Sequence, residues 1–265
     1  IGFLVAIGNK LQLLIIESKG LTKQKFKKTL DAKITKALNL TKEEVLYLSY
    51  DKNKDKRIID KILLLFNVET TRRLQNSTEK YSFDNYKRKK WSLEHIHAQN
   101  SEGLNKKEEQ QKWLDLHKES LLNLSVIDSK QAELSQLIEK IDEHYSSITK
   151  VLFDEIFNEV FYILSEDGDR SYMDSISNMA LLSMENNSTL NNSTFDVKRN
   201  KIIEMDKSGE YIPICTRRVF LKYYTDSKRH QIHFWSENDR EAYMESMIGN
   251  EGVISRYLKV TPINK

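Results

Sequence analysis

Cysteine, proline and glycine are all scarce in this chain. Its 265 residues include one Cys, 2 Pro and 8 Gly. The single Cys215 excludes an internal disulfide and a zinc site built from several cysteines, and it fits a reducing compartment, so we expect a cytoplasmic protein. So little Gly and Pro argues against a turn-rich all-β architecture, and the abundant Leu, Lys, Glu and Ile favour a mainly helical chain.

Long apolar runs are also missing. Residues 1 to 7 are followed by Gly8, Asn9 and Lys10, and residues 11 to 16 are too few, because a transmembrane helix needs about 20 apolar residues. We therefore expect no membrane anchor. The chain opens with Ile1 inside an apolar element, so we expect a fragment of a longer protein with a further domain upstream.

Charge is unevenly distributed along the sequence. The net charge is +3, but residues 102 to 169 hold 7 Lys/Arg and 16 Asp/Glu, so this segment carries −9 and the rest of the chain +12. A polyanion would be attracted to the basic part and repelled by the acidic part. Ordinary solvated helix faces give the same pattern, so charge alone leaves both interpretations open.

Most of the chain shows helical spacing. Leu30, Ile34 and Leu38 recur at four-residue spacing, and Thr41 with Glu44 forms a capping box at the start of the next helix. We expect residues 1–78 to be a helical region that docks to the upstream domain, and we assign it no catalysis. A broad apolar stripe between residues 106 and 164 predicts an acidic pair or trio of helices.

Shorter elements surround this helical stretch. The apolar run at 176 to 183 suits a strand, and residues 195 to 205 are helical in pattern. Lys87 and Arg88 lie in a basic, aromatic stretch from 81 to 90 that could contact a nucleic acid backbone, although a solvated loop is the commoner explanation for such a run.

An acid and a histidine stand side by side at Glu94 and His95, followed by Ile96 and His97. Cleaving a phosphodiester requires a base that deprotonates water and a cation that stabilises charge on the phosphoryl oxygens. A histidine with an ordinary pKa near 6.5 can be neutral and accept a proton, and carboxylate and amide oxygens suit Mg²⁺. The pair therefore suits phosphodiester chemistry, although a glutamate beside a histidine is also common on ordinary helices.

A second set of polar residues follows about eighty positions later. Asn178 and Asn187 flank the end of the apolar run, and Phe195 is followed by Lys198 and Arg199. Together with Glu94-His95-Ile96-His97-Ala98-Gln99, this pattern resembles the HNH nucleases of the His-Me finger superfamily. The resemblance is closest to the subgroup of GmrSD-like, modification-dependent restriction endonucleases, over residues 81 to 100 and 174 to 204.

The resemblance implies a fold and a domain organisation. The fold would be mainly α with a small ββα-metal core and a long helical insertion between the two finger strands. The nuclease core would span residues 79–205, with the insertion at about 104–166, and residues 206–265 would form a helical extension packed on the core. In that family, such a module usually follows a nucleotide-dependent, ParB-like domain.

The resemblance also implies roles for individual residues. His95 would be the general base, and Asn178 would support the base or the metal loop. Glu94 and Asn187 would hold one divalent ion, Mg²⁺ or Mn²⁺. Lys198 and Arg199 would lie near the phosphate backbone of double-stranded DNA that is possibly modified, and the expected function is that of a DNA endonuclease in bacterial restriction or anti-phage defence.

Two positions depart from the family pattern. Ala98 replaces the usual proline, which loosens a loop without removing a chemical group. About seventy residues of helix separate the two finger strands, where simpler members have a short loop. Loop-closure entropy grows slowly with length, so this insertion is tolerable if its helices pack.

Several alternatives stay open at the level of sequence. The chain could be a degenerate finger that binds nucleic acid or serves as a scaffold without cutting, or its substrate could be RNA, although no aromatic platform for single-stranded RNA is evident. His97 is expected to have a structural role, with metal or substrate binding as the alternative. A zinc site from His95, His97 and Cys215 has no support in their spacing, and the remaining histidines are taken as surface or packing residues, namely His117, His144, His230 and His233.

Overall fold

The computed structural model describes residues 1–75, 77–88, 90–97, 104–125, 131–165, 169–185, 192–226 and 232–260. Over these ranges the chain is mainly helical, and its sheet consists of two antiparallel strands. The mainly helical fold expected from composition is therefore confirmed. Within the same ranges, no helix combines the length and the apolar character needed to cross a membrane.

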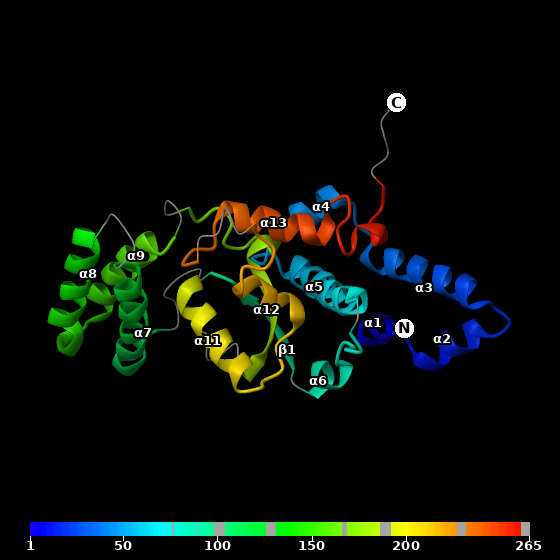
Figure 1. Cartoon of the computed structure of the whole chain (residues 1–265), viewed down its shortest axis with the longest axis horizontal. Helices are drawn as coiled ribbons and strands as arrows, with labels where there is room; N and C mark the ends of the chain where they lie inside the picture. Colours follow the sequence, from blue (N-terminus) through cyan, green and yellow to red (C-terminus); the bar gives the residue numbers. More distant parts are fainter. Residues whose placement is uncertain are drawn as a thin grey trace, which may run out of the picture.

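Helices surround the two strands and extend to both ends of the long axis of the molecule (Figure 1). The α-helices are α1 (Gly2–Ala6), α2 (Leu11–Ser18), α3 (Lys23–Leu38), α4 (Lys42–Leu46), α5 (Asn53–Arg73), α6 (Phe83–Arg88), α7 (Lys107–Ser125), α8 (Gln131–His144), α9 (Lys150–Ile163), α11 (Phe195–Lys207), α12 (Ile214–Phe220) and α13 (Glu237–Ile248). Three short 3₁₀ helices are η1 (Tyr145–Ser147), η2 (Ile176–Asn178) and η4 (Ser255–Tyr257).

The two strands are β1 (Trp91–His95) and β2 (Met179–Ser183). They pair antiparallel, with Trp91 opposite Ser183 and His95 opposite Met179. The pairing continues past the strand ends, because the N–H of Ile96 donates to the carbonyl of Asn178 at 2.8 Å. The two segments that the sequence predicts as strands are thus neighbours in space.

A two-stranded sheet alone is marginally stable, and here the outer edge of β2 is capped by side chains. Alternate carbonyls of an antiparallel strand point to the same edge. Two such carbonyls of β2, and that of Ser177 just before it, accept hydrogen bonds from side chains of the C-terminal third. The donors are Trp235 Nε1 to Ser177, Tyr243 Oη to Met179 and Thr216 Oγ1 to Leu181, at 3.1, 3.2 and 2.6 Å. Every residue of β2 is buried, so these donors satisfy groups that water cannot reach.

Helix α5 runs through the middle of the fold and contacts β1, β2 and α12 (Figure 1). Its second half is buried on most sides, including Leu64, Leu65 and Phe66, none of which is exposed. A hydrogen bond joins α5 to its neighbour α12, because Asn67 Oδ1 accepts the N–H of Cys215 at 2.9 Å. The first third of the chain therefore forms part of the same core as β2.

The segment between the strands folds into the three helices α7, α8 and α9, which contact one another. They lie at one end of the long axis, and α7 also contacts α11 (Figure 1). Trp113 of α7 packs on Phe157 of α9 with ring centroids 4.8 Å apart. Three helices therefore lie between the two strands in the sequence, as the apolar spacing predicts, and they share an apolar core.

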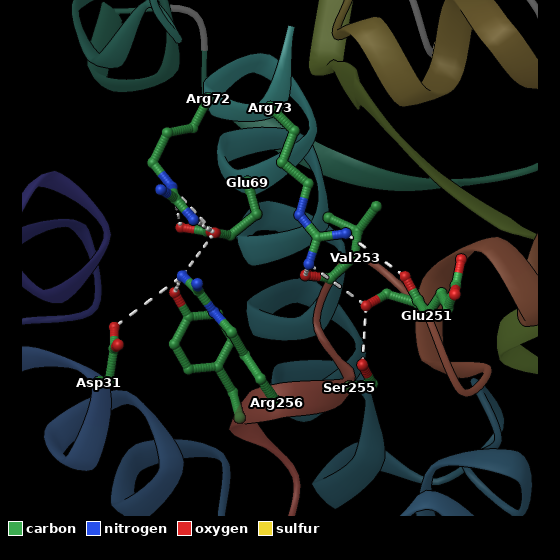
Figure 2. A network of polar contacts seen from close by, with 10 residues as sticks. Asp31, Glu69, Arg72, Arg73, Glu251, Val253, Ser255 and Arg256 are labelled. Atoms are coloured by element: carbon green, nitrogen blue, oxygen red, sulfur yellow. Dashed lines mark hydrogen bonds and ion pairs between the residues drawn. The ribbon is translucent and has the colours of Figure 1, made fainter. Parts of the chain in front are cut away.

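The first third and the C-terminal segment are joined by a polar network on α5 (Figure 2). Glu69, which is 5% exposed, accepts hydrogen bonds from Arg72 at 2.6 Å and from Arg256 at 3.0 Å. Arg73 donates to the carbonyl of Val253 at 2.8 Å. Nearby, the N–H of Lys259 donates to the carbonyl of Leu40 at 2.8 Å. These bonds hold residues 251 to 259 on the helical first third.

Replacing Glu69 tests how strongly this network holds the fold together. We expect Glu69→Gln to lower the free energy of unfolding by about 1–3 kcal/mol, because the two guanidinium groups lose a buried charged acceptor. The measurement is urea denaturation at pH 7. As a control, Glu204→Gln removes a carboxylate that is 64% exposed and paired with Lys201, and we expect less than about 1 kcal/mol. Equal losses of unfolding free energy in the two variants would show that Glu69 has no special role in holding this network together.

Candidate functional site around His95

His95 is the last residue of β1. It is mostly buried, with 17% of its side chain exposed. Burial lowers the pKa of His95 to about 3, and the positive charges of Lys198 and Lys56 act in the same direction. The imidazole is therefore neutral over the physiological pH range. A neutral ring keeps one nitrogen able to accept a proton.

The loop before α5 supplies one wall of this site. The ring of Tyr50 meets the ring of His95 edge-on, with centroids 4.8 Å apart. The ammonium of Lys56 lies 4.3 Å from the centroid of the Tyr50 ring. We assigned no chemistry to the first third from the sequence, so Tyr50 and Lys56 are site neighbours that the sequence analysis missed.

A carboxylate from the segment before β2 supplies another wall. Asp174 Oδ1 lies 3.5 Å from His95 Nε2, and 25% of the Asp174 side chain is exposed. The pKa of Asp174 is raised, chiefly by burial and further by Asp51, while Lys56 opposes the shift. The site thus combines a neutral imidazole with a nearby carboxylate and a nearby ammonium. Asp174 was also missed in the sequence analysis.

Glu94 occupies the opposite face of β1 from His95, because successive side chains of a strand alternate. Its Oε1 atom lies 2.5 Å from Lys198 Nζ, and the two side chains are 7% and 2% exposed. Lys198 Nζ also donates to the carbonyl of His95 at 2.6 Å. Burial raises the pKa of Glu94, with Lys198 opposing the shift.

This geometry does not support two roles expected from the sequence. Glu94 is expected to bind a metal beside His95, but its carboxylate faces α11 and is engaged by a buried ammonium. Lys198 is expected to contact phosphate, but it is 2% exposed and held by protein acceptors. The pair instead ties β1 to α11.

Asn178 lies directly before β2 and is fully buried. Its Oδ1 accepts the N–H of His97 at 2.9 Å, and its Nδ2 donates to the carbonyls of His97 at 3.1 Å and Met173 at 2.9 Å. The side chain therefore holds the backbone two residues beyond His95. These bonds place Asn178 next to the segment that follows His95; the support role expected for it stays a prediction.

His97 and His117 are both buried and together hold the start of α11. The N–H groups of Phe195 and Thr194 donate to His97 Nδ1 at 3.2 Å and to His117 Nε2 at 3.1 Å. The other ring nitrogens face Ser165 Oγ at 3.1 Å and the carbonyl of Trp113 at 2.8 Å. With both nitrogens occupied, His97 has the structural role that we favoured from the sequence.

The remaining residues expected at the site are not shown to gather at His95. Asn187 and Ala98 lie outside the described residues. Arg199 is half-buried, and its Nε atom is buried without a hydrogen bond. Lys87 and Arg88 are exposed on α6. This helix precedes β1, a strand about 13 Å long, whereas His95 is at the other end of that strand.

The zinc alternative finds no support in the structure. Cys215 is fully buried, and its Sγ lies 3.3 Å from Thr70 Oγ1, away from the imidazoles of His95 and His97. Burial raises the pKa of the Cys215 thiol to about 12. Across the described ranges, no group of three or more His, Cys, Asp or Glu side chains could hold a metal ion.

Comparison of the chain with protein-family models, with curated proteins and with solved structures finds no match.

Breaking the Glu94–Lys198 pair should destabilise the fold. We expect Lys198→Met to lower the free energy of unfolding by about 3–5 kcal/mol at pH 7, because it leaves a carboxylate buried without its partner. Burial raises the pKa of Glu94 and Lys198 opposes the shift, so without Lys198 the folded variant takes up a proton at a higher pH than the folded parent, and the deficit should shrink as pH falls. Urea denaturation at pH 7 and pH 5 measures both effects.

The control for this variant is Lys201→Met on the same helix. Lys201 forms an ion pair with Glu204, which is 64% exposed, so we expect a loss below about 1 kcal/mol. A deficit of Lys198→Met that grows as pH falls would show that the Glu94 carboxylate is not the destabilising group.

We expect the two buried histidines, His97 and His117, to make the fold less stable in acid. Burial lowers the pKa of His97 and of His117 to about 3, whereas the unfolded chain binds a proton near 6.5. Their contribution is complete above about 6.5 and is lost as pH falls toward 3. Between pH 8 and pH 5, each should remove about 2 kcal/mol from the free energy of unfolding.

A variant isolates one of these contributions. In His117→Gln, the decline between pH 8 and pH 5 should be about 2 kcal/mol smaller than in the parent. His144→Gln, at the end of α8, serves as the matched control and should leave the decline unchanged. If the free energy of unfolding fell equally with pH in the His117 variant and in the parent, His117 would not be a source of the acid sensitivity.

Proposed function

We propose that this chain is a metal-dependent DNA endonuclease of the HNH type, with His95 as the general base. The observation that carries the proposal is the meeting of β1, β2 and α11 around a neutral, partly accessible histidine at the end of β1. Two strands followed by a helix, with the base at the end of the first strand, is the arrangement that the sequence pattern predicts for a His-Me finger.

The surroundings of His95 suit hydrolysis of a phosphodiester. The neutral imidazole can take a proton from water, which then attacks phosphorus. Lys56 places a positive charge near the ring, where a phosphate could be held. The acidic insertion lies to one side of the molecule, so its charge would repel DNA from that end and orient it.

The metal ligands expected from the sequence do not fit the described geometry. Glu94 is engaged by Lys198, and Asn187 lies outside the described residues. The proposal keeps the dependence on Mg²⁺ or Mn²⁺. It also keeps a double-stranded DNA substrate with or without modified bases, a nucleotide-dependent domain upstream and a place in bacterial defence in the cytoplasm.

One observation favours a second function, that of a nucleic-acid-binding or scaffold module that does not cut. Glu94 is sequestered in a buried ion pair, and a base whose pKa is about 3 is weak. Binding to duplex DNA without cleavage in Mg²⁺ or Mn²⁺ would support this alternative.

Cleavage by His95→Ala tests the proposed function. We expect the parent to nick or cut plasmid DNA in Mg²⁺ or Mn²⁺, and the variant to be slower by about 10²–10⁴-fold, because the proton acceptor is gone. EDTA should abolish cleavage by the parent. His144→Ala, a histidine on α8 outside the site, should retain the parent rate. Equal rates for the parent and the His95 variant would reject the assignment.

A further inference from the structure

We propose that Asp174 positions His95, by accepting the Nε2–H of the imidazole so that Nδ1 is left as the atom that takes the proton. This inference rests on the proposed function and names a residue that the sequence pattern does not assign. Asp174 does not touch the reacting atoms, and its effect passes through the ring of His95.

The structure places the Asp174 carboxylate near Nε2 of the His95 ring. Within the described residues, His95 Nε2 is buried and forms no hydrogen bond, and Asp174 Oδ1 lies 3.5 Å from it. That separation exceeds a hydrogen bond by about half an ångström. Catalytic hydrogen bonds are often long in the absence of substrate and commonly tighten when it binds.

The backbone holds Asp174 in this place. Its carbonyl accepts the N–H of Tyr50 at 2.7 Å, and Ser49 and Ser175 form an antiparallel β-bridge. Tyr50 also packs edge-on against the His95 ring. One loop from the first third therefore fixes the segment that carries the carboxylate and restricts the orientation of the ring.

The carboxylate has a definite chemical effect on the imidazole. A neutral ring has one N–H donor and one acceptor nitrogen, and an acceptor-only carboxylate next to Nε2 selects the Nε2–H form. In the reaction, an O–H bond of water breaks as the Nδ1–H bond forms. The O–P bond to water forms as the bond to the departing oxygen breaks, and that oxygen takes a proton from solvent. Asp174 then stabilises the positive ring.

Nuclear magnetic resonance tests the contact directly. Long-range ¹H–¹⁵N spectra of the histidine-labelled chain report the tautomer of each ring, and the loss of signals in His95→Gln assigns those of His95. We expect the Nε2–H form in the parent. Asp174→Asn should shift it toward the Nδ1–H form, because the amide can donate to Nε2, and Asp174→Glu should keep the parent form. An unchanged tautomer in Asp174→Asn would overturn the proposal.

Kinetics test whether the contact matters for cleavage. We expect Asp174→Asn to lower kcat about 10- to 100-fold in Mg²⁺ with little change in KM, and Asp174→Glu to recover part of the loss. Asp206→Asn makes the same chemical change in an exposed ion pair with Arg217, and it should retain the parent kcat. A parent-level kcat in Asp174→Asn would overturn the positioning role.

The two proposals can fail separately. A parent chain that cleaves no duplex in Mg²⁺ or Mn²⁺ fails as a nuclease, and the catalytic part of the Asp174 proposal fails with it, while the tautomer spectra still decide whether the carboxylate selects the ring form. Cleavage that depends on His95 but not on Asp174 leaves the nuclease in place and removes only the positioning role.

Discussion

The fold depends on the pairing of two short strands that lie far apart in the sequence. β1 ends at His95 and β2 begins at Met179, with the helices α7, α8 and α9 between them. The entropy of closing this long segment is limited because its helices pack on one another. The carbonyls along the outer edge of β2 accept hydrogen bonds from Trp235, Tyr243 and Thr216, so the edge of β2 that faces away from β1 is also bonded within the chain.

Buried polar groups then attach helix α11 to this pair of strands. Lys198 joins Glu94 and the carbonyl of His95, and two neutral histidines accept the first N–H groups of the helix. Each of these groups would be costly to bury alone. Together they fix where β1 ends, and so they set the position of His95. Glu94 therefore contributes to the architecture around His95, which lies on the other face of β1.

Local patterns allowed much of the fold to be predicted. The capping box at Thr41 is present, β2 lies within the apolar run at 176 to 183, and α7, α8 and α9 lie where apolar spacing predicts helices. Strand alternation could also have shown that Glu94 and His95 face opposite ways. This signal was available in the sequence, but the motif was interpreted as a unit that shares one metal site.

The other members of the site could not be found in this way. Tyr50 and Lys56 reach His95 only because α5 packs on the strands, and Asp174 does so through backbone bonds to the loop before α5. Such contacts depend on tertiary packing, and no local spacing encodes them. The burial of Lys198 is of the same kind, because a lysine next to an arginine on a helix looks exposed in sequence.

A crystal structure of the His95→Ala variant with a short DNA duplex and Mn²⁺ would test the central claim most directly. The account predicts a phosphate of the duplex beside position 95, near Tyr50 and Lys56, with anomalous scattering from Mn²⁺ at that phosphate. A duplex bound elsewhere on the chain, with no metal and no phosphate near position 95, would contradict it.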